Sequence, residues 1–301
     1  MPRTRPVPPY LLVLALASPT LAACIDKSDA PLPVLSDGAA ISDDAAAPSL
    51  DLAVRDLASH DLSAQHPPDL YRAPDLGVAH PPGGLAGWYK FDEASGPVTD
   101  SSGTHNDGVA EGQGLTRGGG GRIGGCISFA GGGGHVRIPS SPTLDMTSGG
   151  TVEYWLKLSD VLQGTLNSEI SRGTGNGDDN LLIHSDCGNV QALFSRAIDG
   201  SDGATANCNA VPANVWTHIA VTNDGTTVRL YVNGALIATS AGGGGHLGPI
   251  AADVYVGQRE QGIFPLLGSI DDLKWWTVVR AQGDVCSDGG GKWNGQKCVY
   301  P

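Results

Sequence analysis

The sequence TVRLYVNGALIA, at residues 227–238, decides the fold class of this chain. Within it Val228, Leu230 and Val232 alternate with more polar residues, which is the period of a strand with one buried face. The pair Asn233-Gly234 follows and supplies the two positive-φ positions that a type I′ turn requires. The stretch therefore predicts a β-hairpin.

A second turn extends this hairpin into a meander. Residues 223–226, with the sequence NDGT, connect it to the apolar stretch 216–222. From Leu85 onwards, short apolar runs alternate with clusters of Gly, Asn, Asp and Pro, and we find no convincing helix. The predicted strands are 87–92, 126–130, 135–139, 151–158, 180–184, 190–196, 216–222, 227–232, 236–240, 253–257 and 268–276. So many short strands bury a core most readily as two stacked antiparallel sheets.

Five stretches of this region, taken together, resemble a known family. They are GWYKFDE at 87–93, DSSG at 100–103, WTHIAV at 216–221, LYVNG at 230–234 and GSIDDL at 268–273. In this order they are similar to the LamG-like, concanavalin A-like lectin/glucanase jelly roll. The resemblance implies an all-β, two-sheet antiparallel sandwich over residues 85–280 that binds glycans or other surface proteins. Residues 281–301 then form a cysteine-containing C-terminal tail.

The N-terminus has the pattern of a bacterial lipoprotein signal peptide, at residues 1–23. Arg3 and Arg5 precede an apolar run at 10–17, which is far shorter than the roughly 20 residues of a membrane-spanning helix. The sequence Leu-Ala-Ala-Cys that ends at Cys24 looks like a lipobox, in which the cysteine carries the lipid. The alternative is an ordinary secretory signal, cut after Ala22 or Ala23.

Residues 24–84 have the composition of a disordered tether. They are rich in Asp, Pro and Ala, carry a net negative charge and have no sustained apolar face, so they cannot bury a core. Asp-Leu pairs recur from Asp51 to Leu76, but the prolines at 67, 68 and 74 would interrupt any helix. We interpret the segment as a self-repelling spacer, with a short binding repeat as the alternative.

Charge and motif content exclude several classes of function. The net charge is −13 and no basic patch exists, so we expect no nucleic-acid partner. The glucanase motif Glu-x-Asp-x-x-Glu is missing, because Glu153 is followed by Tyr154 and Trp155. The sequence also lacks a Gly-x-Ser-x-Gly elbow, a His-Glu-x-x-His pair and a Cys-x-x-Cys pair. We therefore expect a protein that is not an enzyme, although carboxylates from separate loops could still form an inverting hydrolase.

Three acidic residues form the sharpest candidate site. The resemblance implies a structural Ca²⁺ held by Asp92, Asp100 and Asp271. Asp271 shares strand parity with Leu273 and Trp275, so we expect it to point inward, where an unpaired carboxylate is costly. The alternative is that these acids cap turns or accept backbone N–H bonds.

The cysteines predict disulfides in an exported protein. With Cys24 set aside, the nearest pairs are Cys187 with Cys208 and Cys286 with Cys298. Cys126 is then left unpaired in an apolar strand.

These observations predict an extracytoplasmic binding module of the cell envelope, lipid-anchored through Cys24 to the outer membrane or the cell surface. Its expected ligand is a glycan or a cell-surface protein, and we expect a monomer. Two alternatives remain, a glycoside hydrolase-like enzyme on the same sandwich and an adhesive or scaffolding protein.

Overall fold

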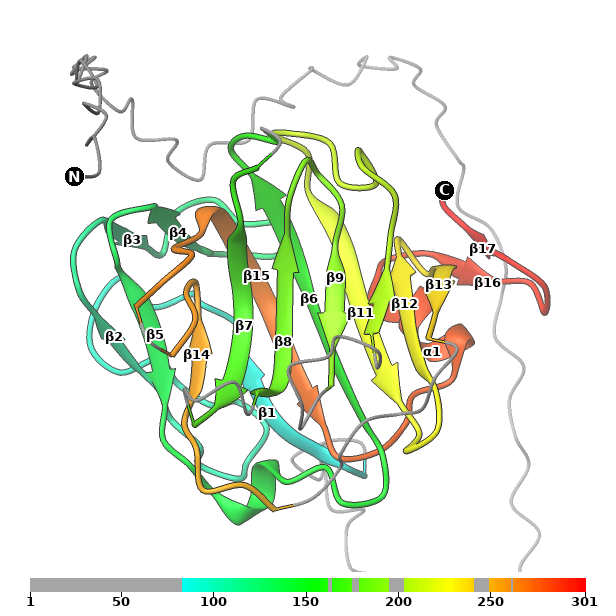
Figure 1. Ribbon diagram of the computed structural model, residues 1–301, viewed down its shortest axis with the longest axis horizontal. Coiled ribbons are helices and arrows are strands. Elements are labelled where there is room, and N and C mark those ends of the chain that lie inside the picture. The colour runs from blue at the N-terminus through cyan, green and yellow to red at the C-terminus, as the bar shows by residue number, and fades with distance from the viewer. Residues whose placement is uncertain (1–82, 162–163, 175–178, 195–202, 241–248, 261) are drawn as a thin grey trace, which may run out of the picture. The chain divides into compact units, whose positions relative to one another are not determined.

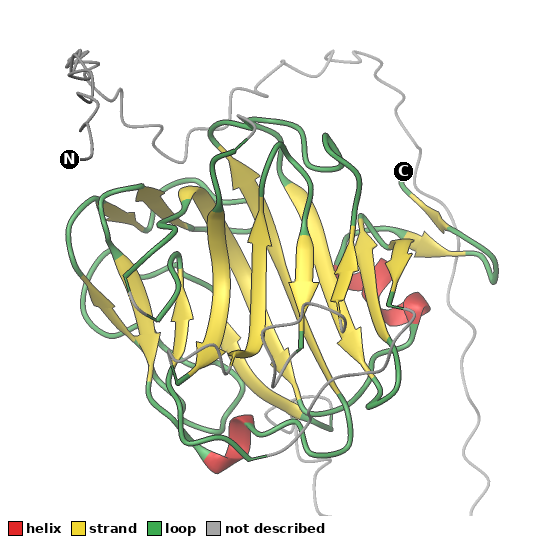
Figure 2. Cartoon of the chain, in the orientation of Figure 1, coloured by secondary structure: helices red, strands yellow, loops and turns green. Residues whose placement is uncertain are grey.

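A computed structural model describes residues 83–161, 164–174, 179–194, 203–240, 249–260 and 262–301. Strands dominate these residues, and only two short helical elements accompany them (Figure 2). The strands form two stacked antiparallel sheets, which confirms the predicted all-β sandwich (Figure 1). The signal peptide and residues 24–82 of the tether, including Cys24, lie outside the described residues.

The first sheet has eight strands and is built around the long strand β15 (Leu267–Trp276). Its order is β13-β12-β11-β6-β15-β4-β3, and β1 pairs with the second half of β15. The other bounds are β1 Leu85–Tyr89, β3 Leu115–Arg117, β4 Ile127–Ala130, β6 Gly150–Leu158, β11 Thr217–Asn223, β12 Val228–Val232 and β13 Ala235–Thr239.

The second sheet has seven strands in the order β10-β9-β8-β7-β14-β5-β2. Their bounds are β2 Val109–Glu111, β5 His135–Ile138, β7 Asn167–Gly173, β8 Asp179–Ser185, β9 Gln191–Leu193, β10 Gly203–Thr205 and β14 Val254–Val256. A short 3₁₀ helix, η1 (Pro142–Leu144), follows β5.

The core lies between the sheets and is built from alternate residues of facing strands. Its fully buried members include Val152, Tyr154, Leu156, Ile170, Ile183, Ile219, Val221, Leu230, Val254, Val256, Ile270 and Leu273. The hairpin predicted from residues 227–238 is confirmed, because β12 pairs with β13 and both turn residues, Asn233 and Gly234, have positive φ. The alternation of apolar and polar residues in β12 therefore predicts correctly which of its faces is buried.

The C-terminal tail contains a helix, so the expectation of no helix is wrong. Helix α1 (Gln282–Asp288) is followed by the small hairpin of β16 (Lys292–Trp293) and β17 (Cys298–Val299). Val285 of α1 packs against Ala220 and Tyr231 on the outer face of the eight-stranded sheet. Seven residues are too short a periodic pattern to distinguish a helix from a loop in the sequence alone. No helix among the described residues has the length and hydrophobicity needed to cross a membrane.

Candidate ligand-binding surface

One edge of the seven-stranded sheet presents a polar and aromatic surface to solvent. In β5 and β14 the residues Val136, Ile138, Val254 and Val256 face the core, so their neighbours point outward. Strand pairing then aligns the outward side chains, because Tyr255 lies opposite Arg137 and Glu111 lies opposite His135. We call the set Glu111, His135, Arg137, Asp253 and Tyr255 the Arg137 surface.

Arg137 is the centre of this surface and is held between two carboxylates. Its guanidinium donates to Glu111 Oε1 at 2.9 Å and to Asp253 Oδ2 at 3.3 Å. The hydrogen bond from Arg137 lowers the pKa of the Glu111 carboxyl below its usual value. All three side chains remain about one-third exposed, so they are ordered by one another and still open to a ligand.

An aromatic platform lies beside the guanidinium. The ring of Tyr255 is half-buried, and its centroid lies 5.7 Å from that of His135. Burial, followed by the charge of Asp253, raises the pKa of the Tyr255 hydroxyl, which therefore keeps its proton at neutral pH. The hydroxyl and the ring face offer a hydrogen-bonding group and an apolar surface side by side.

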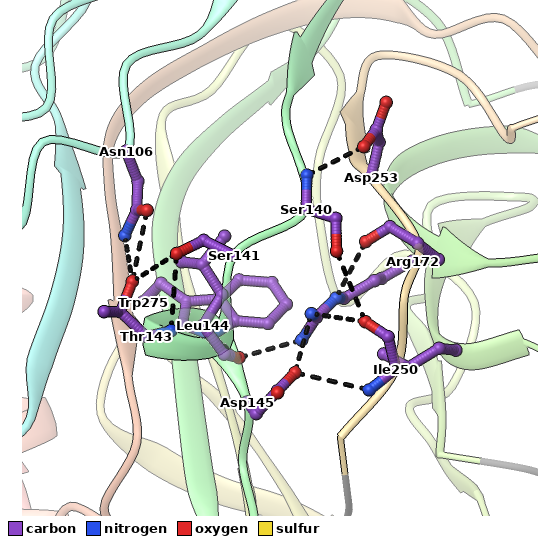
Figure 3. Close-up of polar contacts among 11 residues, drawn as sticks. Asn106, Ser140, Ser141, Thr143, Leu144, Asp145, Arg172, Ile250, Asp253 and Trp275 are labelled. Atoms are coloured by element: carbon purple, nitrogen blue, oxygen red, sulfur yellow. Dashed lines mark hydrogen bonds and ion pairs between the residues drawn. The ribbon is translucent and has the colours of Figure 1, made fainter.

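A pocket of about 370 Å³ adjoins the Arg137 surface. It is lined by residues at the end of β5, by η1 and by the segment before β14: Ser140, Ser141, Pro142, Asp145, Pro249, Ile250 and Ala251. Asp253 connects the two, since its Oδ1 accepts a hydrogen bond of 2.7 Å from the Ser140 backbone N–H (Figure 3). The lining is polar on the η1 side and apolar on the other.

A buried arginine fixes the walls of this pocket. Arg172 of β7 points between the sheets and is only 1% exposed. It donates to Leu144 O at 2.9 Å, to Asp145 Oδ1 at 2.8 Å, to Ile250 O at 3.0 Å and to Ala252 O at 3.2 Å (Figure 3). One guanidinium thus ties both walls together, which preorganises the pocket.

The three acids predicted to bind a metal have other contacts. Asp100 is almost fully buried, and its two oxygens accept four hydrogen bonds of 2.8–2.9 Å, from the backbone of Trp88, Ser102 and Asn106 and from the Thr104 hydroxyl. Although burial acts to raise the pKa of Asp100, these hydrogen bonds lower it. Asp100 therefore organises a turn through the backbone N–H groups of Trp88, Ser102 and Asn106.

Asp92 and Asp271 instead hold the glycine-rich loop at residues 121–125. Asp92 Oδ1 accepts from the Gly125 N–H at 2.6 Å, and Asp271 Oδ2 accepts from the Ile123 N–H at 2.7 Å. Within the described ranges, no three acidic, histidine or cysteine side chains converge to hold a metal ion. These hydrogen bonds are those of the turn-capping alternative, but Asp271 Oδ1 is buried without a hydrogen-bond partner among the described residues, so calcium binding stays a prediction.

The inward orientation predicted for Asp271 is wrong because β15 contains a bulge. Asp272 has a positive φ of 49°, and the register against β6 shifts between Asp271 and Lys274. Ile270 and Leu273 both face the core as a result, and Asp271 lies on the outer face beneath the loop. One extra residue in a strand exchanges the inward and outward faces for all the residues that precede it.

Asp100 offers a direct test of the turn role. We expect Asp100→Ala to lower the free energy of unfolding by about 3 kcal/mol, because four donors lose a charged acceptor. Urea denaturation with and without a chelator measures this loss. Asp284→Ala, at a carboxylate whose side chain is 56% exposed, is the control and should change little. A chelator that destabilised the wild-type protein as much as the Asp100 substitution does would contradict the turn role.

Both predicted disulfides are confirmed. Cys187 pairs with Cys208, and Cys286 pairs with Cys298. Cys126 is not free either, so the expectation that it stays unpaired is wrong. The disulfides indicate an extracytoplasmic protein.

The histidine and two of the tryptophans predicted to be structural are buried. His218 is 2% exposed, and burial lowers its pKa to about 3, so it is neutral. Trp155 and Trp275 are also buried, whereas Trp88 and Trp216 are half-exposed.

The Arg137 surface is not predicted by the sequence. Strands at 135–139 and 253–257 are predicted, but nothing in the sequence shows that β5 and β14, more than a hundred residues apart, lie side by side. The alternation His-Val-Arg-Ile at 135–138 was the available signal, since it places His135 and Arg137 on one outward face.

Comparisons with known proteins agree with this architecture. A family model described as the concanavalin A-like lectin/glucanases superfamily matches residues 130–286. No curated protein matches the sequence.

Two solved binding domains are similar in structure. The binding domain of Paraclostridial Mosquitocidal Protein 1 has a TM-score of 0.53 and 14% identity, over 68% of this chain and 52% of that one. Domain 4 of AbnA, a GH43 extracellular arabinanase from Geobacillus stearothermophilus, was solved in complex with arabinotriose. It has a TM-score of 0.51 and 20% identity, over 68% of this chain and 97% of that one.

An enzyme is also similar over part of its length. The Trypanosoma rangeli sialidase has a TM-score of 0.54 and 16% identity, over 71% of this chain and 34% of that one. The chain thus spans about half of the toxin binding domain and about a third of the sialidase. At these identities the similarity shows the fold alone.

Proposed function

Because this chain belongs to the concanavalin A-like lectin/glucanases superfamily, we propose that its sandwich is a non-catalytic module that binds carbohydrate through the Arg137 surface and the adjoining pocket. The observation that carries the proposal is the exposed arrangement of Arg137 between Glu111 and Asp253, next to the ring of Tyr255. Fixed charged groups orient sugar hydroxyls, and an aromatic face covers the apolar side of a sugar ring. The similarity to a domain solved with arabinotriose supports this choice of ligand class.

The placement of the acidic residues supports a role without catalysis. A glycosidase needs a carboxyl whose pKa is raised and which reaches the glycosidic bond. Burial raises the pKa of Glu153 and of Glu169 to about 8, but both side chains are inaccessible to a polymer. Glu111, which is accessible, has a lowered pKa and is paired with Arg137.

A glycan array on the purified protein tests the binding role. We expect Arg137→Ala to weaken binding at least tenfold, because a hydrogen bond to a charged group contributes about 1.5–3 kcal/mol. Arg229→Ala is the matched control, since Arg229 is equally exposed and paired with Asp224, but lies on the other sheet. Tyr255→Ala should also weaken binding.

Two results would contradict this assignment. Binding that survives both the Arg137 and the Tyr255 substitutions would move the glycan site elsewhere. A protein that binds no sugar but crosslinks to an envelope protein would support the adhesive alternative, and release of sugar products from a polymer would support the hydrolase.

We further propose that the module is attached to the bacterial envelope through a lipid on Cys24. The support is the Leu-Ala-Ala-Cys sequence, placed directly after an apolar run of signal-peptide length. Cys24→Ala is expected to move the protein from the membrane fraction to the soluble extracytoplasmic fraction, as immunoblotting would show. Retention of this variant in the membrane fraction would contradict lipid attachment.

A further inference from the structure

The C-terminal segment carries acidic side chains onto a charged part of the eight-stranded sheet. Besides the packing of Val285, Gln282 Nε2 of α1 donates to Gly234 O at 3.0 Å. The last residue of α1, Asp288, then lies at the outward side chains of β6 and β15. These contacts hold a carboxylate of the tail against a lysine of the sheet.

Lys274 of β15 and Asp288 are close enough to react. Lys274 Nζ lies 3.3 Å from Asp288 Oδ1, and the two side chains are 13% and 24% exposed. On the other side of the carboxyl, Arg280 donates a hydrogen bond to Asp288 Oδ2. The amine, the carboxyl and a guanidinium are therefore aligned around one carbon atom, Asp288 Cγ.

Glu153 of β6 completes the cluster. It lies directly opposite Lys274 in the strand pairing and is fully buried. Trp276 Nε1 fixes one of its oxygens with a hydrogen bond of 2.7 Å to Oε1, whereas Oε2 has no hydrogen-bond partner among the described residues. A buried carboxyl oxygen without a hydrogen bond is costly, and His218 Nε2 lies 3.8 Å from this one.

The protons of the cluster are shared between the two acids. Burial, followed by the charge of Asp288, raises the pKa of Glu153 to about 8, so Glu153 holds a proton at neutral pH. Burial acts to raise the pKa of Asp288 too, but the charges of Lys274 and Arg280 and the hydrogen bond from Arg280 lower it. Transfer of the proton from Glu153 to Asp288 turns the second carboxylate into a neutral, more electrophilic acid.

We propose that Lys274 and Asp288 condense to a side-chain amide, which ties the C-terminal segment covalently to the sheet. The geometry that carries the proposal is a lysine and an aspartate in contact, flanked by a buried glutamate and an arginine. The modification is independent of the proposed carbohydrate site, which lies on the other sheet.

The reaction needs only these four side chains. Glu153 gives its proton to Asp288 and accepts one from the Lys274 ammonium, so the amine becomes nucleophilic. Nζ attacks Asp288 Cγ, and Arg280 stabilises the negative charge that develops on Oδ2. Glu153 then passes one proton from the attacking nitrogen to Oδ1. The bond from Cγ to Oδ1 breaks, and Oδ1 leaves as water. One ammonium and one carboxylate give one amide and one water, with no change of oxidation state.

Proximity makes the condensation feasible in water. Amide formation from a free amine and a free acid is unfavourable in dilute solution, but groups held in contact reach effective molarities of about 10⁵–10⁸ M. The low exposure of the cluster also hinders the reverse hydrolysis. The Cys286–Cys298 disulfide closes the segment that carries Asp288, which limits its departure from the sheet.

Mass spectrometry of the purified full chain after reduction of its disulfides tests the proposal. We expect a mass lower by one water and a tryptic species in which the peptide with Lys274 is joined to the peptide with Asp288. Glu153→Gln and Asp288→Ala should each restore the full mass. A wild-type protein with its full mass, and with separate peptides after prolonged incubation, would overturn the proposal.

Two controls separate this product from others that also lose water. Asp288 precedes Gly289, so a succinimide could form there, but it would leave Lys274 free for tryptic cleavage. Asp272 lies 3.2 Å from Lys274 Nζ, and a link to Asp272 would place the branched peptide within β15. Either of these products overturns the assignment to Asp288. Lys274→Arg gives a further check if the Glu153 variant does not fold, because an arginine retains the charge and cannot form the amide.

Discussion

Replacement of Arg172 by methionine is expected to lower the free energy of unfolding by about 3–5 kcal/mol. The substitution removes the four hydrogen bonds to Leu144, Asp145, Ile250 and Ala252, and it leaves the Asp145 carboxylate without its ion pair. Methionine fills a similar volume, so the loss reports on these polar groups and not on a cavity. Loss of one partner of a buried pair is far more costly than loss of an exposed pair.

Urea unfolding followed by tryptophan fluorescence measures this change. The midpoint should fall while the dependence on urea concentration stays constant, which identifies a change in stability. Arg229→Met is the control, because its pair with Asp224 is about one-third exposed and should contribute less than about 1 kcal/mol. Arg172→Lys should lie between the two, since an ammonium cannot reproduce the planar set of donors. An Arg172→Met protein within 1 kcal/mol of wild type would refute the role assigned to this residue.

The same substitution should weaken the proposed carbohydrate binding. Arg172 makes no direct contact with a ligand in the pocket, but it holds the η1 wall and the wall before β14 at a fixed separation. Binding measured below the unfolding transition should therefore fall in Arg172→Lys as well. The Arg137 surface beside the pocket depends on strand pairing and should be less affected.

The strands that the sequence predicts share one property, the alternation of apolar and polar residues. The hairpin of β12 and β13 is the clearest case, and β6, β11 and β15 follow it. Strand β7 has the sequence NSEISRG and could not be found in this way, although all seven of its residues are buried. Its charged residues, Glu169 and Arg172, are buried and hydrogen-bonded to tertiary partners, which periodicity does not report.

The candidate sites depended on similar tertiary information. The two disulfides joined near neighbours in the sequence and were correctly paired. The sequence does not show that hydrogen-bond donors of the protein surround Asp100, or that the bulge at Asp272 turns Asp271 outward. The Arg137 surface required the order of strands in the second sheet, which local patterns do not fix.

Replacement of Glu169 by glutamine is expected to stabilise the protein at pH 8 and to flatten its stability between pH 5 and pH 8. Glu169 is fully buried between the sheets, where Oε1 accepts a hydrogen bond of 2.6 Å from the Ser185 hydroxyl. Oε2 has no hydrogen-bond partner among the described residues, and neither has the hydroxyl of Tyr154. Burial raises the pKa of Glu169 from 4.5 to about 8.

The direction of the effect follows from proton binding. Between pH 4.5 and pH 8 the folded protein holds a proton on Glu169 that the unfolded chain has lost. The contribution of this group is therefore complete below pH 4.5 and is lost as the pH rises towards 8, by about 1.4 kcal/mol per pH unit. Glutamine is neutral at every pH and keeps an acceptor for Ser185. In the variant, the free energy of unfolding should therefore fall less steeply with pH, by the contribution of this one proton.

Urea unfolding of both proteins at several pH values between 5 and 8 measures the difference. The curves should converge near pH 5 and separate as the pH rises, with the variant more stable. Ser185→Ala should act in the opposite direction, because the hydrogen bond from Ser185 lowers the pKa of Glu169. Glu111→Gln is the surface control: Glu111 has a lowered pKa, so its contribution is lost on acidification and should not change the slope above pH 5. Parallel wild-type and Glu169→Gln curves would show that Glu169 is ionised within the fold, which would contradict its raised pKa.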